Sequence, residues 1–401
     1  MLVSLGAAPA QAMPMFARKY KIECAMCHAA VPRLNYTGFK FKSAGYRMPW
    51  EVGKEQNENA LRFENSNAFI AILNAPYQVQ LNHPDGTTSS SFQFNAQEVD
   101  IHPLTGSWGK WWGSGFEVDA LPDGTVSVNQ GFLSFTDGTD NSFWSVQGGL
   151  FPNFLSYGAL DRPLAISTPL VLSATANNPA LDTLFSWAGP RAAGLTGSYW
   201  IGDTYLSASV RNRLVANSNA LDALGSSTGN FGDFLFSATH FFDRGGSGSA
   251  VSLAYYKGLS EIPMTLGGSE LYGNSFNHLL LSANYYLTDR WNITAGAGWG
   301  QDQLYDTGTG NVDQNLYHAG TFVGLEYFWN PQLASGIRYD QFTSDLNTPD
   351  TGTLAGTLYL SYRPIDQVIL SGEYQYLHNE AATPSAGVDE SVLTAQVLLA
   401  F

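Results

Sequence analysis

The stretch HLLLSANYYL, residues 278–287, alternates apolar and polar side chains along most of its length. Successive side chains of a β-strand point to opposite faces of the sheet, so this stretch predicts a strand with one apolar and one polar face. A tilted strand needs about 9–11 residues to cross a bilayer, with lipid on one side and a polar interior on the other. The apolar face carries Leu279, Leu281, Ala283, Tyr285 and Leu287, opposite His278, Ser282 and Asn284.

The same alternation recurs from about residue 66 to the end, for example in HAGTFVGLEYFW (318–329) and TLAGTLYLSYR (353–363). Turn-forming residues separate the repeats, as expected between strands. The sequence therefore predicts sixteen strands, at 66–81, 90–103, 107–121, 124–136, 142–153, 189–200, 203–216, 232–242, 249–258, 275–287, 291–301, 317–329, 332–343, 353–362, 366–378 and 388–401.

The connections between these strands alternate in length. Those after even-numbered strands are mostly short, as at 288–290 and 330–331, whereas most of those after odd-numbered strands are long, as at 154–188 and 217–231; the connection at 122–124 breaks the rule. Outer-membrane barrels have short periplasmic turns and longer extracellular loops. The pattern predicts an all-β, 16-stranded antiparallel transmembrane barrel in the outer membrane of a Gram-negative bacterium, with both termini periplasmic.

Composition agrees with a barrel whose outer face meets lipid. Charged residues make up only 13% of the 401 residues, aromatic residues another 13%, and the mean hydropathy is -0.11. No apolar run reaches the roughly 18 residues that would predict a membrane-spanning helix. The ending TAQVLLAF, with a terminal Phe401, resembles the last strand of bacterial outer-membrane barrels. The alternative is a soluble β-sandwich with exposed aromatic residues.

The chain divides into a small basic part and a large acidic part. Residues 1–60 hold 8 of the 19 Lys and Arg but only 4 of the 34 Asp and Glu, which gives this part a net charge of +4. Residues 61–401 therefore carry a net charge of -19, and the whole chain carries -15. Nucleic acid is excluded as a partner, because binding phosphates needs a basic patch. Residues 1–12, apolar and ending in Ala10-Gln11-Ala12, predict a truncated signal peptide. We expect three parts: this signal at 1–12, a small domain at 13–60 and the barrel at 61–401.

Both cysteines of the chain lie in CAMCH, residues 24–28. C-x-x-C-H is the attachment sequence for a c-type haem, in which Cys24 and Cys27 form thioethers and His28 binds the iron. A disulfide between the cysteines leaves His28 unexplained. A zinc site needs a second ligand pair, and a thioredoxin-like pair needs a βαβ pattern, and neither follows in the sequence. The motif predicts one covalently attached haem c.

The haem-bearing segment is too small to enclose a haem alone. Residues 13–60 are close to the roughly 40-residue limit below which chains seldom fold unaided, so we expect the segment to plug the barrel and use its wall. Met48, 20 residues beyond His28, is a candidate distal iron ligand. Its rivals are a water or open position and the barrel residues His102, His278 and His318. The acidic pairs Glu98/Asp100 and Glu117/Asp119 are expected to face inward and to pair with plug residues Arg33, Lys40, Lys42 or Arg47, or alternatively to attract a metal.

The N-terminal segment resembles the fused monohaem cytochrome–porins of iron-oxidising bacteria. The residues that carry the resemblance are Phe16-Ala17-Arg18, Tyr20, the Cys24/Cys27/His28 motif, Pro32, Leu34-Asn35, Gly38, Phe41 and Gly45-Tyr46-Arg47. Across the barrel the resemblance is one of size and strand number only.

The resemblance implies an iron-oxidising oxidoreductase. Extracellular Fe(II) would donate single electrons, which one haem inside the barrel would pass to a periplasmic c-type cytochrome. Two other functions fit the same residues: a passive porin whose haem-containing plug stabilises or gates it, and an exporter of electrons to external acceptors. Nothing in the barrel sequence identifies an iron site.

Overall fold

The computed structural model describes residues 14–56, 62–82, 86–120, 124, 126–151, 164–173, 192–212, 231–242, 248–263, 271–305, 312–348, 351–380 and 388–401. The predicted signal peptide and the predicted boundary between residues 60 and 61 lie outside these ranges. Among the residues described, no helix is both long and apolar enough to span a membrane.

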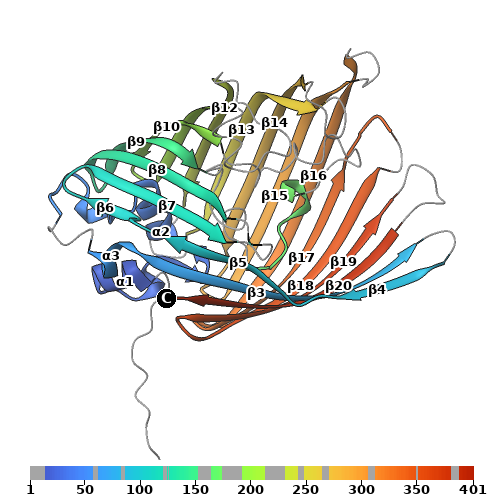
Figure 1. The fold of residues 1–401 in the computed structure, drawn as a ribbon, viewed down its shortest axis with the longest axis horizontal. Coiled ribbons are helices and arrows are strands. Elements are labelled where there is room, and N and C mark those ends of the chain that lie inside the picture. The colour runs from blue at the N-terminus through green and yellow to red at the C-terminus, as the bar shows by residue number, and fades with distance from the viewer. Residues whose placement is uncertain are drawn as a thin grey trace, which may run out of the picture.

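A closed antiparallel barrel dominates the structure (Figure 1). In the described part of the chain it contains eighteen strands, and three of these, β4–β6, are pieces of one interrupted strand between β3 and β7, so sixteen strands make the wall. The last strand closes onto the first through the pairing of β20 with β3. The strands are β3 (Ala68–Asn82), β4 (Thr88–Phe92), β5 (Asn95–His102), β6 (Gly106–Trp108), β7 (Trp112–Ala120), β8 (Val126–Thr139), β9 (Ser142–Phe151), β10 (Ala192–Ile201), β11 (Thr204–Asn212), β12 (Phe231–Phe241), β13 (Ala250–Pro263), β14 (Leu271–Tyr286), β15 (Trp291–Tyr305), β16 (Val312–Asn330), β17 (Leu333–Thr343), β18 (Gly352–Ile365), β19 (Val368–Asn379) and β20 (Val388–Ala400).

The sixteen predicted strands are confirmed, in order and close to their predicted bounds. Residues 107–108 do not begin the third strand but lie in β6, which turns at 109–111 and pairs with the start of β7. Strands β13–β16 also extend four or five residues beyond their predicted bounds at one end of the barrel. The predicted alternation of connections is also present, because two-residue turns at 140–141, 202–203, 331–332 and 366–367 all lie at one end of the barrel. We call this the short-turn end and the opposite one the long-loop end.

The wall has an apolar outer face and a largely polar inner face. Along β17, exposed and buried residues alternate, with Ile337 and Tyr339 outside and Arg338 and Asp340 inside. Hydroxyl groups bond to one another across neighbouring strands on the inner face, as between Ser207 and Ser237 Oγ atoms at 2.6 Å. The alternation that predicted the fold therefore separates the barrel's two environments.

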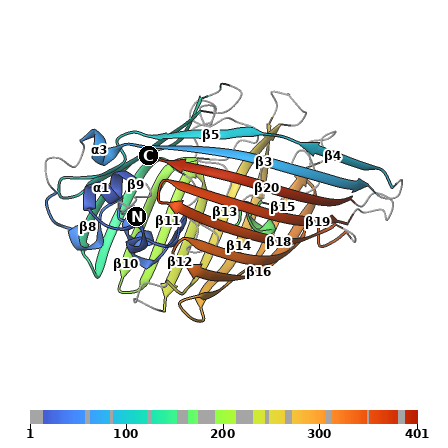
Figure 2. The same ribbon diagram turned by 90° about the horizontal axis from the view of Figure 1, so that it is seen from below.

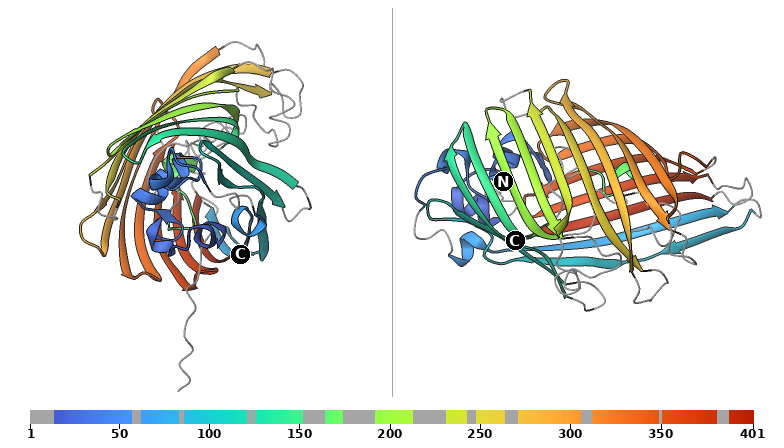
Figure 3. Two further views of the ribbon diagram at one scale, coloured as in Figure 1. Left: turned by 90° about the vertical axis from the view of Figure 1, so that its left-hand side faces the viewer. Right: turned by 90° about the horizontal axis from the view of Figure 1, so that it is seen from above.

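Residues 14–56 form a plug inside the short-turn end of the barrel (Figures 2 and 3). Its elements are short because the segment is rich in turns and has no long apolar stripe. The plug contains α1 (Pro14–Tyr20), η1 (Cys24–Met26), β1 (His28–Ala30), β2 (Arg33–Leu34), α2 (Tyr36–Ser43) and η2 (Pro49–Glu51). A one-turn helix, α3 (Phe63–Ser66), precedes the first barrel strand in the sequence and contacts α1 of the plug.

Aromatic packing joins the plug to the barrel wall. Phe39 of α2, only 1% exposed, packs edge-on against Tyr205 with ring centroids 5.2 Å apart. Trp200 Nε1 donates a hydrogen bond to Ser43 Oγ at 2.7 Å. Because such rings bury large apolar areas, this contact fixes α2 against β10–β12.

Arg33, Lys40 and Arg47 of the plug contact other partners on the barrel than the predicted acidic residues of β5 and β7. Arg33 forms a fully buried, two-pronged ion pair with Glu326, and Lys40 Nζ lies 3.5 Å from Asp140 Oδ1. Arg47 donates hydrogen bonds to carbonyl oxygens of the β6–β7 hairpin, including Trp108 O at 3.1 Å and Gly109 O at 3.0 Å. Burial by itself would lower the pKa of Arg33, but Glu326 reverses this and raises it, so the guanidinium stays charged.

Part of the long connection between β9 and β10 lies inside the barrel. Residues 164–173, including α4 (Leu170–Ser173), pack against β15–β17 in the lumen, where Arg338 Nη1 donates to Ser167 O at 2.8 Å. The Leu170 amide donates to Asp340 Oδ1 at 3.1 Å. This segment narrows the lumen between the plug and the long-loop end.

Candidate functional site

The C-x-x-C-H motif is a tight turn clamped by Asn35. Cys24–Met26 form the 3-10 helix η1, and the Cys27 amide donates to Cys24 O at 3.0 Å. Asn35 Nδ2 donates to Ala25 O at 3.1 Å and to Met26 O at 3.2 Å, while the Asn35 amide donates to Cys27 O at 2.9 Å. The same side chain caps α2 by accepting from the Gly38 amide. Asn35 therefore holds the motif and the helix together.

Gly38 allows α2 to approach this turn. A β-carbon at position 38 would collide with the carbonyl oxygen of Cys27 and lie 3.0 Å from a methyl group of Leu34. Only glycine leaves room for this contact. The motif and α2 thus form one compact unit.

His28 is oriented by its own loop. Its Nδ1 lies 3.1 Å from Pro32 O, and a carbonyl oxygen can only accept, so Nδ1 is the donor. The proton on Nδ1 leaves Nε2 with its lone pair available for a metal, as in metal-bound histidines generally. This is the arrangement required of an iron ligand.

Cys24, Cys27 and His28 all line a cavity between plug and barrel. The volume of this cavity is about 130 Å³. Plug residues such as Phe41 and Tyr46 form one wall. The barrel supplies the other wall through Ile70, His102, Glu117, Ile369, Leu398 and Ala400.

The two thiols differ in their surroundings. Cys24 Sγ donates a hydrogen bond to Asp366 Oδ2, in the turn between β18 and β19, at 3.4 Å. Burial, followed by the effect of Cys24, raises the pKa of the Cys27 thiol to about 12. A thiol held neutral in this way is a poor nucleophile at neutral pH, which argues against a redox or protease-like cysteine.

Met48 and His102 occupy different positions relative to the cavity. Met48 is 0% exposed and packs in an apolar cluster with Met15, Phe41 and Phe132. It is not among the residues that line the cavity, whereas His102 is. His102 lies on β5 near Asp100 and Glu117, and these three side chains place potential ligand atoms within 4.8 Å of one another.

The residues around the cavity fit a covalently bound haem. Two sulfur atoms and an oriented imidazole meet at one side, an imidazole of the barrel stands among the lining residues, and the remaining lining is mostly apolar. Of the acidic residues predicted to face inward, Asp100 and Asp119 are buried opposite each other on β5 and β7, and Glu117 lines the cavity. The side chain of Glu98 lies outside the described residues.

The other two predicted rivals for the iron lie elsewhere. His278 of β14 and His318 of β16 both contact Asp302 of β15 in the lumen, apart from the cavity at the plug. Both histidines are among the residues predicted from the sequence, whereas Asp302 is not. The sequence pattern could have identified Asp302, because residues 300 and 302 of β15 share the inward face with His278 and His318 in the neighbouring strands.

Comparison with known proteins supports the fold. The chain matches no protein-family model and no curated protein sequence. It resembles the outer membrane channel DcaP of Acinetobacter baumannii, with a TM-score of 0.56 and 14% identity over 87% of this chain and 100% of that one. Pseudomonas putida OprB gives a TM-score of 0.56 and 12% identity over 84% and 94% of the chains, and an anion-selective porin from Comamonas acidovorans gives 0.53 and 12% over 84% and 99%. The barrel therefore has the fold of outer-membrane porins.

Proposed function

We propose that this protein carries single electrons across the outer membrane of a Gram-negative bacterium. One haem c attached to Cys24 and Cys27 would accept electrons from extracellular Fe(II) and deliver them to a periplasmic c-type cytochrome. The observation that carries the proposal is the cavity, because it places both thiols and the oriented imidazole of His28 against an inner wall supplied by the barrel.

The outer-membrane location is supported by the barrel's outer face. Large apolar side chains such as Leu281, Val323 and Leu358 are about half exposed there, which in water would make an aggregating surface. Lipid is the solvent that such a closed, apolar barrel suits. The plug and both described ends of the chain, Pro14 and Phe401, would then be periplasmic, because they lie at the short-turn end (Figure 2).

The residues of the plug have separable tasks in this proposal. Cys24 and Cys27 would hold the porphyrin, His28 Nε2 would bind its iron, and Asn35 would keep the attachment turn in place. His102 is the better supported distal ligand, since it lines the cavity and Met48 does not. The haem would supply a one-electron redox centre, whose potential depends on its axial ligands and on burial.

The charge of the chain suits a cationic electron donor. Its net charge of -15 would raise the local concentration of Fe(II) and the encounter rate. The direction of electron flow depends on the haem potential and on the partners. A midpoint potential too low for Fe(II) to reduce the haem would favour export of electrons instead.

The test is reduction of the purified protein by Fe(II), followed in the Soret band by stopped flow. We expect the wild type and the control His240→Ala, which removes an exposed histidine of β12, to be reduced alike. Cys24→Ala and His28→Ala should lose this reduction while still shifting on heating in gels, as a folded barrel does. Full oxidation of Fe(II) by the His28→Ala protein would refute the assignment.

The porin-like fold also favours a second candidate, a passive porin. In this case the barrel would admit small solutes past the plug. The buried Arg33–Glu326 pair and the packing of Phe39 argue for a fixed plug. Liposomes containing the protein should therefore fail to swell in small sugars, and swelling at the rate of open porins would favour the passive porin.

A further inference from the structure

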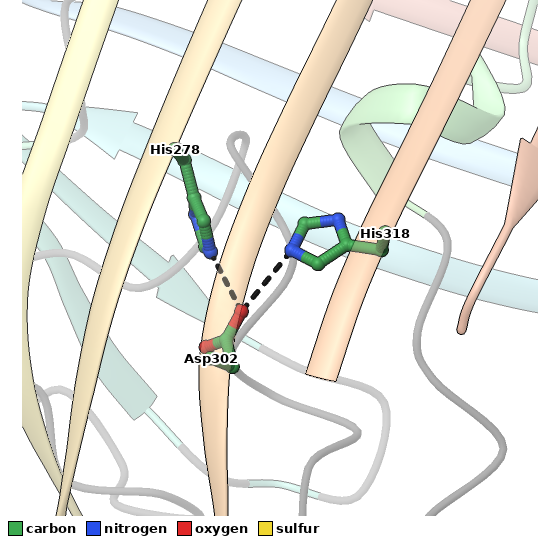
Figure 4. A group of neighbouring side chains, drawn as sticks. All are labelled: His278, Asp302 and His318. Carbon is green, nitrogen blue, oxygen red and sulfur yellow. Dashed lines mark hydrogen bonds and ion pairs between the residues drawn. The ribbon is translucent and has the colours of Figure 1, made fainter. Parts of the chain in front are cut away.

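Three ligand-type side chains converge in the lumen away from the plug (Figure 4). His278 Nε2 lies 2.9 Å and His318 Nε2 lies 3.1 Å from the same oxygen, Oδ2 of Asp302. All three residues are almost completely buried, at 2%, 5% and 0% exposure. The donor atoms come from three adjacent strands, β14, β15 and β16, so the barrel wall holds them rigidly.

The backbone register explains why these side chains meet. Gly300 lies between His278 and His318 in the sheet, as the partner of both. A β-carbon at Gly300 would overlap the ring of His318 and lie 2.7 Å from Cδ2 of His278. Glycine therefore leaves the space into which both imidazoles lean, and Asp302 reaches the same space from two positions along the strand.

We infer that His278, Asp302 and His318 form a binding site for a divalent first-row transition-metal ion. Two imidazole nitrogens and one carboxylate oxygen are donors that suit Fe²⁺, Co²⁺ or Zn²⁺, whereas Mg²⁺ and Ca²⁺ prefer sites made of oxygen alone. Three protein ligands leave further coordination positions for water or another ligand. The inference does not rest on the proposed haem.

The distances fit such an ion. Two ligands about 2.1 Å from a metal and at right angles to each other are about 3.0 Å apart. The two nitrogen–oxygen separations of 2.9 and 3.1 Å agree with this value. The same distances also suit hydrogen bonds, so the assignment of a metal site depends on the donor types and on the charge of Asp302. A dication would also offset the charge of the buried Asp302 carboxylate.

Aromatic and aliphatic side chains lie beside the three residues. The rings of Phe276 and Phe342 lie 5.1 Å from His278 and 5.9 Å from His318, respectively. Val171 of α4 covers Gly298 and Gly320, one inward-facing position closer to the short-turn end. The site thus lies on the long-loop side of the segment that narrows the lumen. An apolar shell of this kind strengthens the binding of a cation by its ligands.

The experiment is equilibrium dialysis of the purified full-length protein against Zn²⁺ with excess Mg²⁺, with zinc measured by elemental analysis. We expect one zinc per chain that Mg²⁺ does not displace and that the double variant His278→Gln/His318→Gln lacks. Each single variant should weaken binding by at least about 10- to 100-fold, which is the loss typical when only a residue that supports a metal ligand is changed. Zinc-edge X-ray absorption of the wild type should show imidazole scattering. The exposed-histidine variant His240→Gln serves as the control and should bind as the wild type does.

A second pair of variants tests the site without removing a ligand. Gly300→Ala should abolish the same zinc, because its methyl group occupies the space of the imidazoles. Gly356→Ala is the matched control, since a β-carbon there meets nothing within 4 Å. Equal zinc binding by the wild type and the folded double variant, or by Gly300→Ala and Gly356→Ala, would overturn the inference. So would the absence of zinc from the wild type, which would leave a hydrogen-bonded cluster only.

Discussion

Replacing Arg33 by methionine should weaken the docking of the plug in the barrel by more than the loss of a surface salt bridge would. Arg33 and Glu326 are each 1% exposed, and Glu326 also accepts hydrogen bonds from Asn292 Nδ2 and Tyr359 OH, each at 2.7 Å. Those two neutral donors would remain in Arg33→Met, but the carboxylate would be buried without its guanidinium. Breaking a buried pair on one side costs about 3–5 kcal/mol.

The magnitude can be read from hydrogen exchange. At 1.4 kcal/mol per factor of ten, this cost corresponds to about 100- to 4,000-fold faster exchange of amides in α2, measured by mass spectrometry. The Phe39 amide, which donates to Asn35 O at 3.0 Å, is a suitable reporter. His240→Ala is the control, because it removes an exposed side chain of β12 and leaves no buried charge without its partner.

The double variant Arg33→Met/Glu326→Gln separates a buried charge from lost packing. We expect its exchange to fall back toward that of the wild type, because no unpaired charge remains. If Arg33→Met exchanges within tenfold of the wild type, the ion pair does not hold the plug. If the exchange rate of the double variant equals the rate expected from adding the separate effects of Arg33→Met and Glu326→Gln, the unpaired buried charge is not the cause of the faster exchange.

Four further predictions concern the plug and its cavity. Phe39→Ala should weaken docking by about 3–5 kcal/mol, seen as a lower urea midpoint for loss of plug structure, and an unchanged midpoint would contradict the packing argument. Burial lowers the pKa of Lys19 from 10.5 to about 8, so the docked plug binds the Lys19 proton less tightly than the undocked plug does. Docking of the wild-type plug should therefore become stronger, relative to that of Lys19→Met, as the pH rises from about 8 to 10.5. A difference in docking free energy between the two proteins that stays constant over this range would contradict the prediction. His102→Ala should shift the Soret and charge-transfer bands of the haem protein whereas Met48→Ala should not, and the opposite result would restore Met48 as the distal ligand. Asn35→Ala should lower the yield of haem-loaded protein, measured as Soret absorbance per chain, because it frees the turn at Cys24–Met26.

The barrel could be predicted from the sequence because its physics is local. Alternation such as that of residues 278–287 depends only on neighbouring positions, and turn residues mark where each strand ends. The boundary at 107–108 was missed because β6 and β7 form one tight hairpin within a continuous alternating stretch, and only the pairing of Trp108 with Trp112 reveals the turn.

Pairings between distant segments could not be predicted in the same way. The plug cations were expected to meet acids on β5 and β7, yet Arg33 contacts Glu326, which is 293 positions away. Such a partner depends on how deep the plug sits and how it is rotated, and neither leaves a local trace. The motif at Cys24, Cys27 and His28 was visible for the opposite reason, since its chemistry lies within five consecutive residues. Asp302 was missed because its significance appears only when three strands stand in register.

The cavity wall on the barrel side is built across the seam where the cylinder shuts. Ile70 belongs to β3, and Leu398 and Ala400 belong to β20, the two strands whose pairing completes the ring. A sheet in which β3 and β20 are not paired would therefore lack part of the cavity wall that faces Cys24 and Cys27. If the proposed haem is bound here, its enclosure depends on closure of the barrel, so a variant that weakens the pairing of β3 with β20 should also lose haem.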